Sequence, residues 1–267
     1  MSKEQLQGYT NRLLLNPDGT ITKLFEDNGV TKRSSKVRQD MESFALKNIA
    51  FSPHLLKEVP HAITMTRLEG ETGMDGFLPQ LPEATQVSIF ESAGRALRFV
   101  HQEYQTQNSV ELYLNRLVND CICRVPLVEN GLLRNDIDPN DLQNYLSRNI
   151  DINEIKRCGI TVIHGDYWLN NIIGKINSKF CLTGIIDWEM GGTGSPYQDF
   201  ALVALSMEQL HPVSREAFWR GYGLIPDEDM KQYFSIRQIL IWMSEDLQAD
   251  FSSEFYKDKL ELIRKTL

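Results

Sequence analysis

The chain has 267 residues, of which 42% are hydrophobic and 24% are charged, a composition typical of a folded globular protein and not of a disordered one. With 28 Lys and Arg against 36 Asp and Glu, the net charge of −8 argues against nucleic-acid or anionic-membrane partners, because both attract positively charged surfaces. Four cysteines without a C-x-x-C pair, no apolar N-terminal segment of the signal-peptide type and no long apolar run predict a cytoplasmic protein with reduced thiols.

Residues 1–69 predict a small strand-rich region that contains one helix. Strands are expected over 9–15 and 20–25, because the Asn-Pro-Asp-Gly sequence between them is a strong turn signal. Apolar residues at helical spacing predict a helix that begins near Ser35. A further strand is expected within 60–68, with Ala-Ile-Thr-Met of 62–65 at its centre, before three glycines loosen the chain.

The rest of the chain is expected to be mainly helical. Pro82 and the Asp-Pro pair at 138–139 stand where helices begin, since proline fits the first helical turn and aspartate caps it. The other expected elements are a helix over 110–124, a short strand over 160–163, a hairpin of 171–175 and 181–187, and helices after Pro196. The sequence therefore predicts an α+β chain, with a strand-rich lobe at 1–69 and a larger helical lobe at 70–267.

The strongest chemical signal lies around the predicted hairpin. In HGDYWLNN, Asp166 follows an apolar strand and Asn171 comes five residues later, and in IIDWE, Asp187 ends the next strand. Phosphoryl transfer needs such side chains, because one carboxylate orients the attacking hydroxyl while amide and carboxylate oxygens hold Mg²⁺. Asn170 is the alternative to Asn171, although the spacing favours Asn171. A polar loop built from common turn-forming residues is the competing interpretation.

The sequences HGDYWLNNII and GIIDWE resemble motifs of the aminoglycoside phosphotransferase and choline kinase superfamily, small-molecule kinases related to the protein kinases. The resemblance extends over about residues 6 to 250 and implies a two-lobed, protein-kinase-like α+β fold. It implies that Asp166 is the catalytic base and that Asn171 and Asp187 hold Mg²⁺. It also implies structural roles for His164 and for Asp199, the later aspartate that helps to hold the catalytic loop.

The same resemblance implies that the first lobe binds ATP, with GTP as the alternative nucleotide. A Gly-x-Thr-Asn turn between the first two strands allows close backbone approach to phosphate and offers polar donors. A later strand resembles the hinge that receives the adenine edge. The residues expected to contact the nucleotide are Gly8, Thr10 and Asn11 in the turn, and Met65, Thr66 and Leu68 at the hinge.

Lys23 alternates with Ile21 and Phe25 along its predicted strand, so its side chain is expected among apolar neighbours. A lysine in such a place is costly without an anion. The resemblance makes it the phosphate-binding lysine, with Glu42 of the next helix as its partner and Asp40 as the rival partner. The alternatives are a lysine that protects an edge strand and a solvated Glu42.

The acceptor site is expected in the helical lobe. Trp242 and Asp246 share a helix face and form a candidate site for an ammonium group, or else a core tryptophan beside a solvated acid. The other candidate substrate residues are Glu189, Trp219 and Tyr222. The acidic residues of this lobe favour a cationic acceptor, unless they form solvated outer faces. They are Glu208, Glu216, Asp227, Glu228, Asp229, Glu245, Asp246 and Asp250.

The sequence thus predicts an enzyme that transfers the γ-phosphoryl group of MgATP to a hydroxyl of a small molecule, either an aminoglycoside-like antibiotic or an amino alcohol such as choline or thiamine. The main alternative is a catalytically inactive, kinase-like nucleotide-binding module. A protein kinase is disfavoured because few residues separate Asp187 from Pro196, which leaves no room for a long activation segment. A metal hydrolase would leave the first lobe unexplained. No oligomeric state follows from the sequence.

Overall fold

The structure is a computed structural model that describes residues 4–6, 11–27, 33–71, 78–177, 179–207, 212–245 and 253–267. The chain forms two compact units, each built from several segments. The first unit consists of Met1–Tyr104, Val162–Gly192 and Ser206–Ile225, and the second of Gln105–Thr161, Thr193–Leu205 and Pro226–Leu267. This division by packing does not coincide with the lobe boundary predicted between residues 69 and 70, which stays a prediction.

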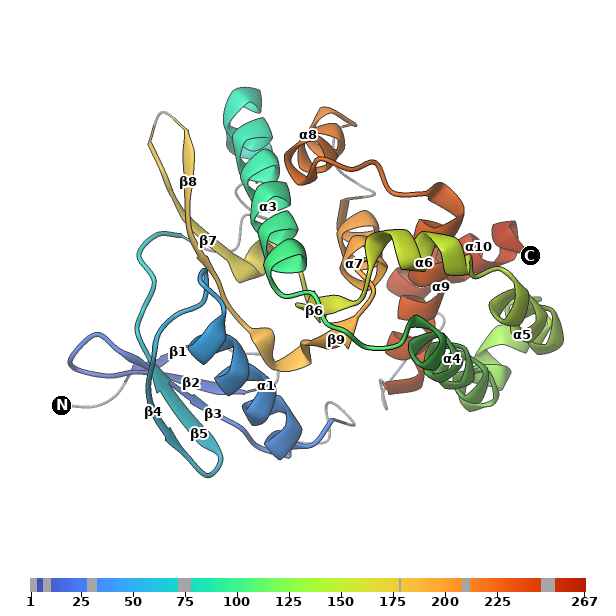
Figure 1. Cartoon of the computed structure of the whole chain (residues 1–267), viewed down its shortest axis with the longest axis horizontal. Coiled ribbons are helices and arrows are strands. Elements are labelled where there is room, and N and C mark those ends of the chain that lie inside the picture. The colour runs from blue at the N-terminus through green and yellow to red at the C-terminus, as the bar shows by residue number, and fades with distance from the viewer. Residues whose placement is uncertain are drawn as a thin grey trace. The chain divides into compact units, whose positions relative to one another are not determined.

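A five-stranded antiparallel sheet opens the first unit, in the order β1-β2-β3-β5-β4 (Figure 1). Its strands are β1 (Glu4–Leu6), β2 (Arg12–Leu15), β3 (Ile21–Leu24), β4 (Leu55–Val59) and β5 (Ala62–Met65). The predicted turn joins β2 to β3: the Gly19 amide donates to the Asn16 carbonyl at 2.9 Å, and Gly19 has a φ of 83°, which glycine adopts easily.

Helix α1 (Ser35–Asn48) packs against β4 and β5. Ser34 caps it, because its hydroxyl accepts a hydrogen bond from the Val37 amide. Strand β5 alternates half-buried and buried residues, so that Ile63 and Met65 face Phe25 and Leu46 of α1 in one apolar cluster. This cluster fixes α1 on the sheet and thereby places the polar residues of α1 beside those of β3.

The remainder of the first unit carries the HGDYWLNN and IIDWE sequences. Strands β7 (Ile172–Ile176) and β8 (Phe180–Ile185) form the predicted hairpin, and short 3₁₀ turns occur at η1 (Leu78–Gln80), η2 (Leu169–Asn171) and η3 (Trp188–Met190). Helix α3 (Glu83–Glu103) packs on α8 (Pro212–Tyr222). Their backbones approach closely at two glycines. A Cβ added to Gly94 would lie 2.1 Å from the Phe218 carbonyl oxygen, and a Cβ added to Gly221 would lie 2.1 Å from the Glu91 carbonyl oxygen.

The second unit is helical. It contains α4 (Val110–Leu133), α5 (Pro139–Arg148), α6 (Ile152–Cys158), α9 (Glu228–Glu245) and α10 (Glu254–Thr266). The elements with residues in both units are β6 (Thr161–Ile163), β9 (Gly192–Gly194) and α7 (Tyr197–Met207), most of which lies in the second unit. Helix α5 starts at Pro139 with Asp138 as its cap, as the sequence predicts. Helix α4 continues beyond the predicted end near residue 124 and passes through Pro126.

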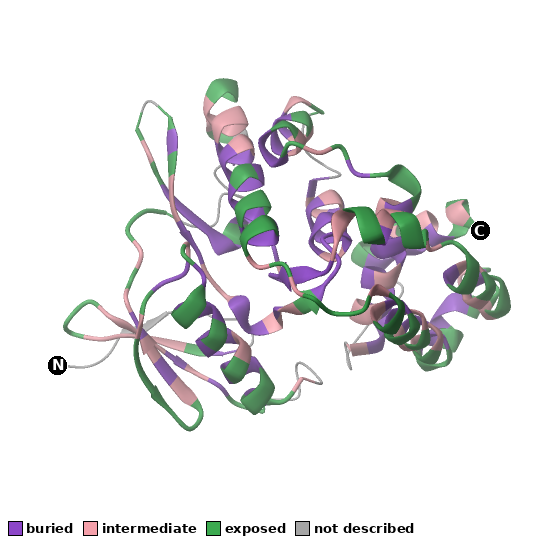
Figure 2. Ribbon diagram, in the orientation of Figure 1, coloured by how far each residue is buried: buried purple, intermediate pink, exposed green. Residues whose placement is uncertain are grey.

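Burial distinguishes the helices of the second unit (Figure 2). Helix α9 is buried along most of its length, whereas α5 buries only Leu142 and Leu146. Among the residues that the structure describes, none of the helices has the length and apolar character needed to cross a membrane.

Candidate active site

The turn after β6 is held by a glycine and a histidine. Gly165 has a φ of 77°, and an added Cβ would lie 2.1 Å from the Met190 carbonyl oxygen, so that only glycine fits there. The buried His164 ring places Nε2 2.9 Å from the Ile186 carbonyl oxygen and accepts a hydrogen bond from the Asp166 amide at Nδ1, at 3.2 Å. A neutral imidazole satisfies both contacts, and it ties the Asp166 turn to the residue that precedes Asp187.

Asp166 and Asn171 lie side by side. Asn171 Nδ2 is 2.8 Å from the Asp166 carbonyl oxygen and 3.1 Å from its Oδ2. Asn171 is buried, whereas Asn170 is exposed, so the arrangement matches the spacing that favoured Asn171. The Asn171 amide nitrogen is thus engaged with Asp166, while its amide oxygen forms no hydrogen bond with another residue that the structure describes.

Asp187 follows β8 in a left-handed conformation, with φ 67° and ψ 56°. Aspartate tolerates this region better than most residues, and such outliers cluster at functional sites. The Asp187 carboxylate forms an ion pair with Lys23, whose charge holds the pKa of Asp187 below its usual value although burial acts to raise it. Burial, followed by the charge of Asp187, raises the pKa of Asp166 to about 7.

Lys23 is buried among three carboxylates. Its Nζ lies 3.0 Å from Glu42 and 3.1 Å from Glu189, in addition to the ion pair with Asp187. Asp40, the rival partner, instead pairs with Lys36 on the surface. Burial acts to lower the pKa of Lys23, but the three carboxylates together raise it, so the lysine is charged. Burial also raises the pKa of Glu42 to about 7, against the opposing charge of Lys23.

A second buried cation, Arg38, completes this network and is absent from the predicted site. Its side chain is fully buried, donates to the Asn11 amide oxygen at 2.6 Å and lies 3.7 Å from the Glu189 carboxylate. Asn11 Nδ2 in turn donates to Glu189. Glu189, proposed from the sequence as an acceptor-site residue, is therefore buried in the Lys23 network. The spacing of Arg38 four residues before Glu42 was the available signal, since residues four apart share a helix face.

The negative charge of this site exceeds the positive charge. Two buried cations, Lys23 and Arg38, face the carboxylates of Glu42, Asp187 and Glu189. The described residues contain no group of three or more His, Cys, Asp or Glu side chains arranged for a metal. Mg²⁺ at phosphate-transfer sites commonly takes one or two protein carboxylates and retains water and phosphate oxygens in its coordination shell.

The predicted hinge follows β5. Met65 is buried, and the Thr66 amide donates to the His54 carbonyl oxygen at 3.0 Å. This amide is thus occupied by the strand pairing, and Thr66 can offer an adenine edge only its carbonyl. The Leu68 side chain packs against Gly184 of β8, where an added Cβ would lie 2.4 Å from it.

The candidate acceptor residues are distributed over both compact units. Trp219 and Tyr222 belong to α8 in the first unit, where the buried Tyr222 hydroxyl lies 2.9 Å from His101 Nδ1. Trp242 belongs to α9 in the second unit and packs near Phe255. The predicted residues Gly8, Thr10, Asp246, Glu208 and Asp250 lie outside the described residues, and Asp199 is buried at the start of α7.

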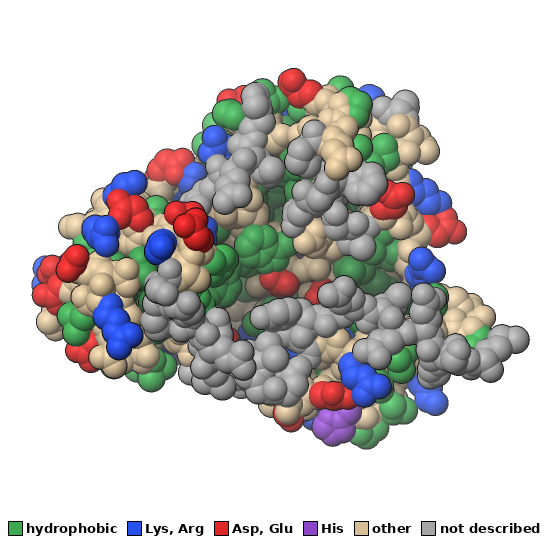
Figure 3. All heavy atoms as spheres, turned by 180° about the vertical axis from the view of Figure 1, so that it is seen from behind, with side chains coloured by type: hydrophobic (Ala, Val, Ile, Leu, Met, Phe, Trp, Pro, Cys, Tyr) green, Lys and Arg blue, Asp and Glu red, His purple; other side chains and the backbone are tan. Residues whose placement is uncertain are grey.

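Three acidic residues of the later chain have local roles in the described residues. Asp227 accepts from the Met230 amide in the first turn of α9, Glu228 pairs with Lys231, and Glu245 pairs with Arg124 at 3.1 Å. Acidic and basic side chains are interspersed over the face drawn in Figure 3 and do not form a patch of one sign.

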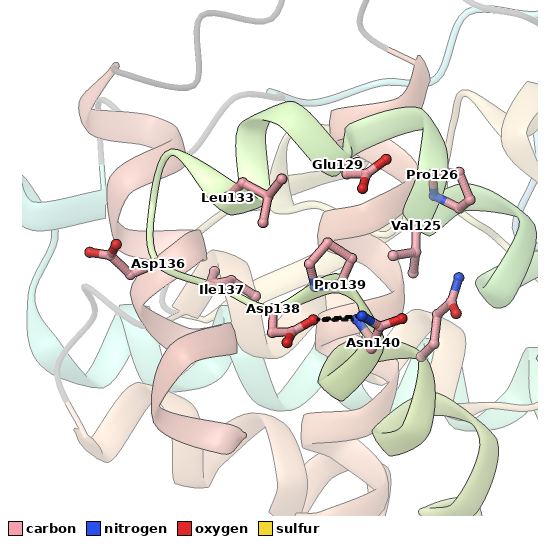
Figure 4. A pocket seen from close by; sticks show the side chains of 10 residues that line it. Val125, Pro126, Glu129, Leu133, Asp136, Ile137, Asp138, Pro139 and Asn140 are labelled. Carbon is pink, nitrogen blue, oxygen red and sulfur yellow. Dashed lines mark hydrogen bonds between the residues drawn. The ribbon is translucent and has the colours of Figure 1, made fainter.

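A cavity of about 580 Å³ lies apart from the predicted site residues, between α4 and α5 of the second unit (Figure 4). Its charged lining residues are all acidic: Glu129, Asp136 and Asp138. Asp138 is also the cap of α5, so at least this carboxylate serves the helix. None of the residues predicted to bind nucleotide, metal or acceptor lines this cavity.

Comparison with known proteins identifies the fold. Residues 49–233 match the model of the phosphotransferase enzyme family, APH. The chain is similar to the GDP complex of wild-type aminoglycoside 2'-phosphotransferase-IIIa, at 17% identity and a TM-score of 0.68, with 99% of this chain and 92% of that chain covered. It is also similar to ADP-bound aminoglycoside phosphotransferase APH(2'')-Ib, at 14% identity and a TM-score of 0.66, with 99% and 92% covered.

A third similar structure is an ethanolamine kinase from Plasmodium vivax, at 14% identity and a TM-score of 0.64, with 99% of this chain and 81% of that chain covered. These similarities confirm the predicted two-lobed, protein-kinase-like α+β fold. No curated protein matches the chain.

Proposed function

Since the chain belongs to the phosphotransferase enzyme family, we propose that it transfers the γ-phosphoryl group of ATP to a hydroxyl group of a small molecule. One observation carries this proposal: the pair Asp166 and Asn171 and the ion pair of Lys23 with Asp187 occur in the same compact unit. These are the side chains that phosphoryl transfer uses to orient a hydroxyl, hold metal and contact phosphate. GTP is the alternative donor, since the similar structures hold ADP in one case and GDP in another.

Asp166 is the proposed base. Its pKa, raised to about 7, lies near the working pH of most enzymes, where a group can both accept and release a proton. The hydrogen bonds from Asn171 Nδ2 and the backbone contact to His164 fix the orientation of this carboxylate. Asp166 would therefore position the acceptor oxygen and take its proton as the new phosphate bond forms.

Lys23, Asn171 and Asp187 would serve the nucleotide. Mg²⁺ bridges the phosphate oxygens in such reactions and neutralises the charge that develops on them. The Asp187 carboxylate and the free amide oxygen of Asn171 are the groups that would hold it. Glu42 and Glu189 would keep Lys23 charged and in place, so that its ammonium group can contact phosphate oxygens.

The acceptor is proposed as a hydroxyl compound of low molecular weight. The similar structures are named for aminoglycoside and ethanolamine, both of which carry amines, and the sequence hypothesis also favours a cationic acceptor. In this chain the described carboxylates that motivated that hypothesis include Asp227, Glu228 and Glu245, which cap helices or form ion pairs. The amine therefore stays a hypothesis to be tested against neutral and anionic acceptors.

A nucleotide-consumption assay tests the function. The full chain is incubated with MgATP or MgGTP and a panel of cationic, neutral and anionic hydroxyl compounds, with Asp166→Asn as the matched control. We expect acceptor-dependent release of nucleoside diphosphate by the wild type and a strong loss in the variant. Nucleotide binding without turnover for any acceptor would instead favour the alternative of an inactive nucleotide-binding module.

A further inference from the structure

A groove of about 310 Å³ lies within the second unit and has a different character from the acidic cavity between α4 and α5. It is formed where α4 and α9 pack together, with residues of β9 and α7 at its side (Figure 1). The polar lining residues used below are Tyr113, Arg116, Asp120, Thr193, Gln198 and Arg237. None of them belongs to the site proposed for phosphoryl transfer.

Gln198 is oriented so that it presents hydrogen-bond donors. The Tyr113 hydroxyl donates to the Gln198 side-chain oxygen at 3.0 Å and accepts from the Ser195 amide at 3.1 Å. The oxygen of Gln198 is therefore engaged, while its NH₂ group forms no hydrogen bond with the residues that the structure describes. This fixed amide adds two neutral donors to the groove.

Arg237 is nearly buried but has few partners. Only 12% of its side chain is exposed, its Nε is buried without a hydrogen-bond partner, and its Nη2 reaches Asp120 at 3.4 Å, which is long for a hydrogen bond. Asp120 is shared, because it also pairs with Arg124 at 3.0 Å. A buried donor without a partner is unfavourable, so a ligand that engages this guanidinium would gain binding energy.

Arg116 supplies a second guanidinium. It is exposed on α4, lines the groove, and has no hydrogen bond or ion pair with any residue within the described ranges. The lining thus contains two arginines and one carboxylate, and that carboxylate is already divided between two cations. In a chain with a net charge of −8, this groove is a local site of positive charge that is rich in donors and poor in free acceptors.

We propose that this groove binds the anionic group of a small molecule, a carboxylate or a phosphate, through Arg116 and Arg237 with the Gln198 amide as a neutral donor. Guanidinium groups suit both anions, because their planar donors match two oxygens at once. The anion has two potential sources, the acceptor of the proposed phosphotransfer or a separate effector. The first source is motivated by the sequence, in which Thr193 of the groove is the sixth residue after Asp187. Only this choice of source rests on the proposed function.

Calorimetric titration of the full chain with inorganic phosphate tests the proposal. MgADP is included so that phosphate does not occupy a nucleotide site. The variant Arg116→Ala changes an exposed side chain and is expected to fold, and it should weaken phosphate binding by about tenfold or more. The matched control is Arg134→Ala, which removes the same charge from the exposed C-cap of α4 outside the groove and should bind phosphate like the wild type.

A variant that is expected to tighten phosphate binding strengthens the test. Asp120→Asn removes the one competing carboxylate of the groove and should tighten phosphate binding by about two- to fivefold. Equal weakening by Arg116→Ala and Arg134→Ala would show that net charge alone matters and would overturn the proposal, as would the absence of saturable phosphate binding.

Steady-state kinetics then distinguishes the two sources of the anion, the acceptor and a separate effector. If the acceptor carries the anion, Arg116→Ala should raise KM for a hydroxy acid but not for the corresponding amide, with kcat little changed. If the anion is an effector, phosphate should change the rate with a neutral acceptor, and Arg116→Ala should remove that change. A chain without any phosphotransfer would refute the proposed function, while the titration would still decide the groove.

Discussion

At the scale of single residues, the proposed chemistry depends on Asp166. Replacing it with asparagine keeps the shape of the side chain and removes its ability to accept a proton. We expect Asp166→Asn to bind ATP nearly as the wild type does but to lower turnover by about a hundredfold or more. The measurement compares nucleotide affinity with kcat for the same preparation. Turnover close to that of the wild type would remove Asp166 from the mechanism.

The raised pKa of Asp166 also makes a prediction about stability. An aspartate whose folded pKa lies above its unfolded value binds protons more tightly in the native state, so its favourable contribution is complete below about pH 4 and is lost as the pH rises through about 7. Without nucleotide and metal, Asp166→Asn should therefore be more stable than the wild type near pH 8, by about 1–3 kcal/mol. Chemical unfolding measures this difference.

The same comparison near pH 3 is the control, since Asp166 is then largely neutral in both states and the difference should nearly vanish. Glu42, whose pKa is also about 7, titrates in the same range in both proteins and cancels in the comparison. A difference that does not depend on pH would contradict a raised pKa.

A further prediction concerns the role of Asp187 in metal binding. Asp187→Ala removes one hard oxygen ligand and also frees Lys23 from an ion pair. We expect the variant to lose the enhancement of nucleotide binding by Mg²⁺ while keeping some metal-independent affinity through Lys23. Titration of ATP with and without Mg²⁺ tests this, and full retention of the enhancement would show that Asp187 does not hold metal.

At the scale of elements, α3 and α8 pack so closely that their contact cannot accept an additional side-chain atom at Gly94. An added Cβ at Gly94 would lie 2.1 Å from the Phe218 carbonyl oxygen, so the two backbones would have to separate. We expect Gly94→Ala to destabilise the protein by about 1–3 kcal/mol through overpacking. Gly192→Ala is the control, because nothing lies within 4 Å of a Cβ added there. Thermal unfolding of both variants measures the effect, and equal stability would contradict the close helix contact.

At the scale of the whole molecule, the two proposed binding sites belong to different compact units. The residues proposed for nucleotide and metal lie in the first unit, and the arginine groove lies in the second. MgATP should therefore slow amide hydrogen exchange in β3, α1 and the catalytic hairpin, and phosphate should slow it in the first half of α4. Helices α5 and α10 serve as internal controls, and equal protection of all helices by MgATP would contradict this assignment.

The sequence alone determined the local parts of the site. Asn171 lies beside Asp166 because only five positions separate the two residues in the chain. Lys23 lies among buried neighbours because side chains alternate between the two faces of a strand. Both features therefore follow from residues close together in the sequence. The turn at Asn16, the start of α1, the cap of α5 and the hairpin after Asp166 are likewise local and were predicted. The kinase-like α+β fold followed from the motifs that these elements carry.

Only the tertiary structure decided how distant side chains group. Glu189 is joined to Arg38 and Asn11 although more than a hundred residues separate them in the chain, and no spacing rule places a carboxylate relative to a partner so far away. The Thr66 amide donates a hydrogen bond to the His54 carbonyl oxygen. The identity of residue 66 does not reveal that its amide is engaged in this way. Arg116 and Arg237 share a groove because α4 packs on α9. The order of charged residues along the sequence does not reveal which of them form ion pairs in the folded protein.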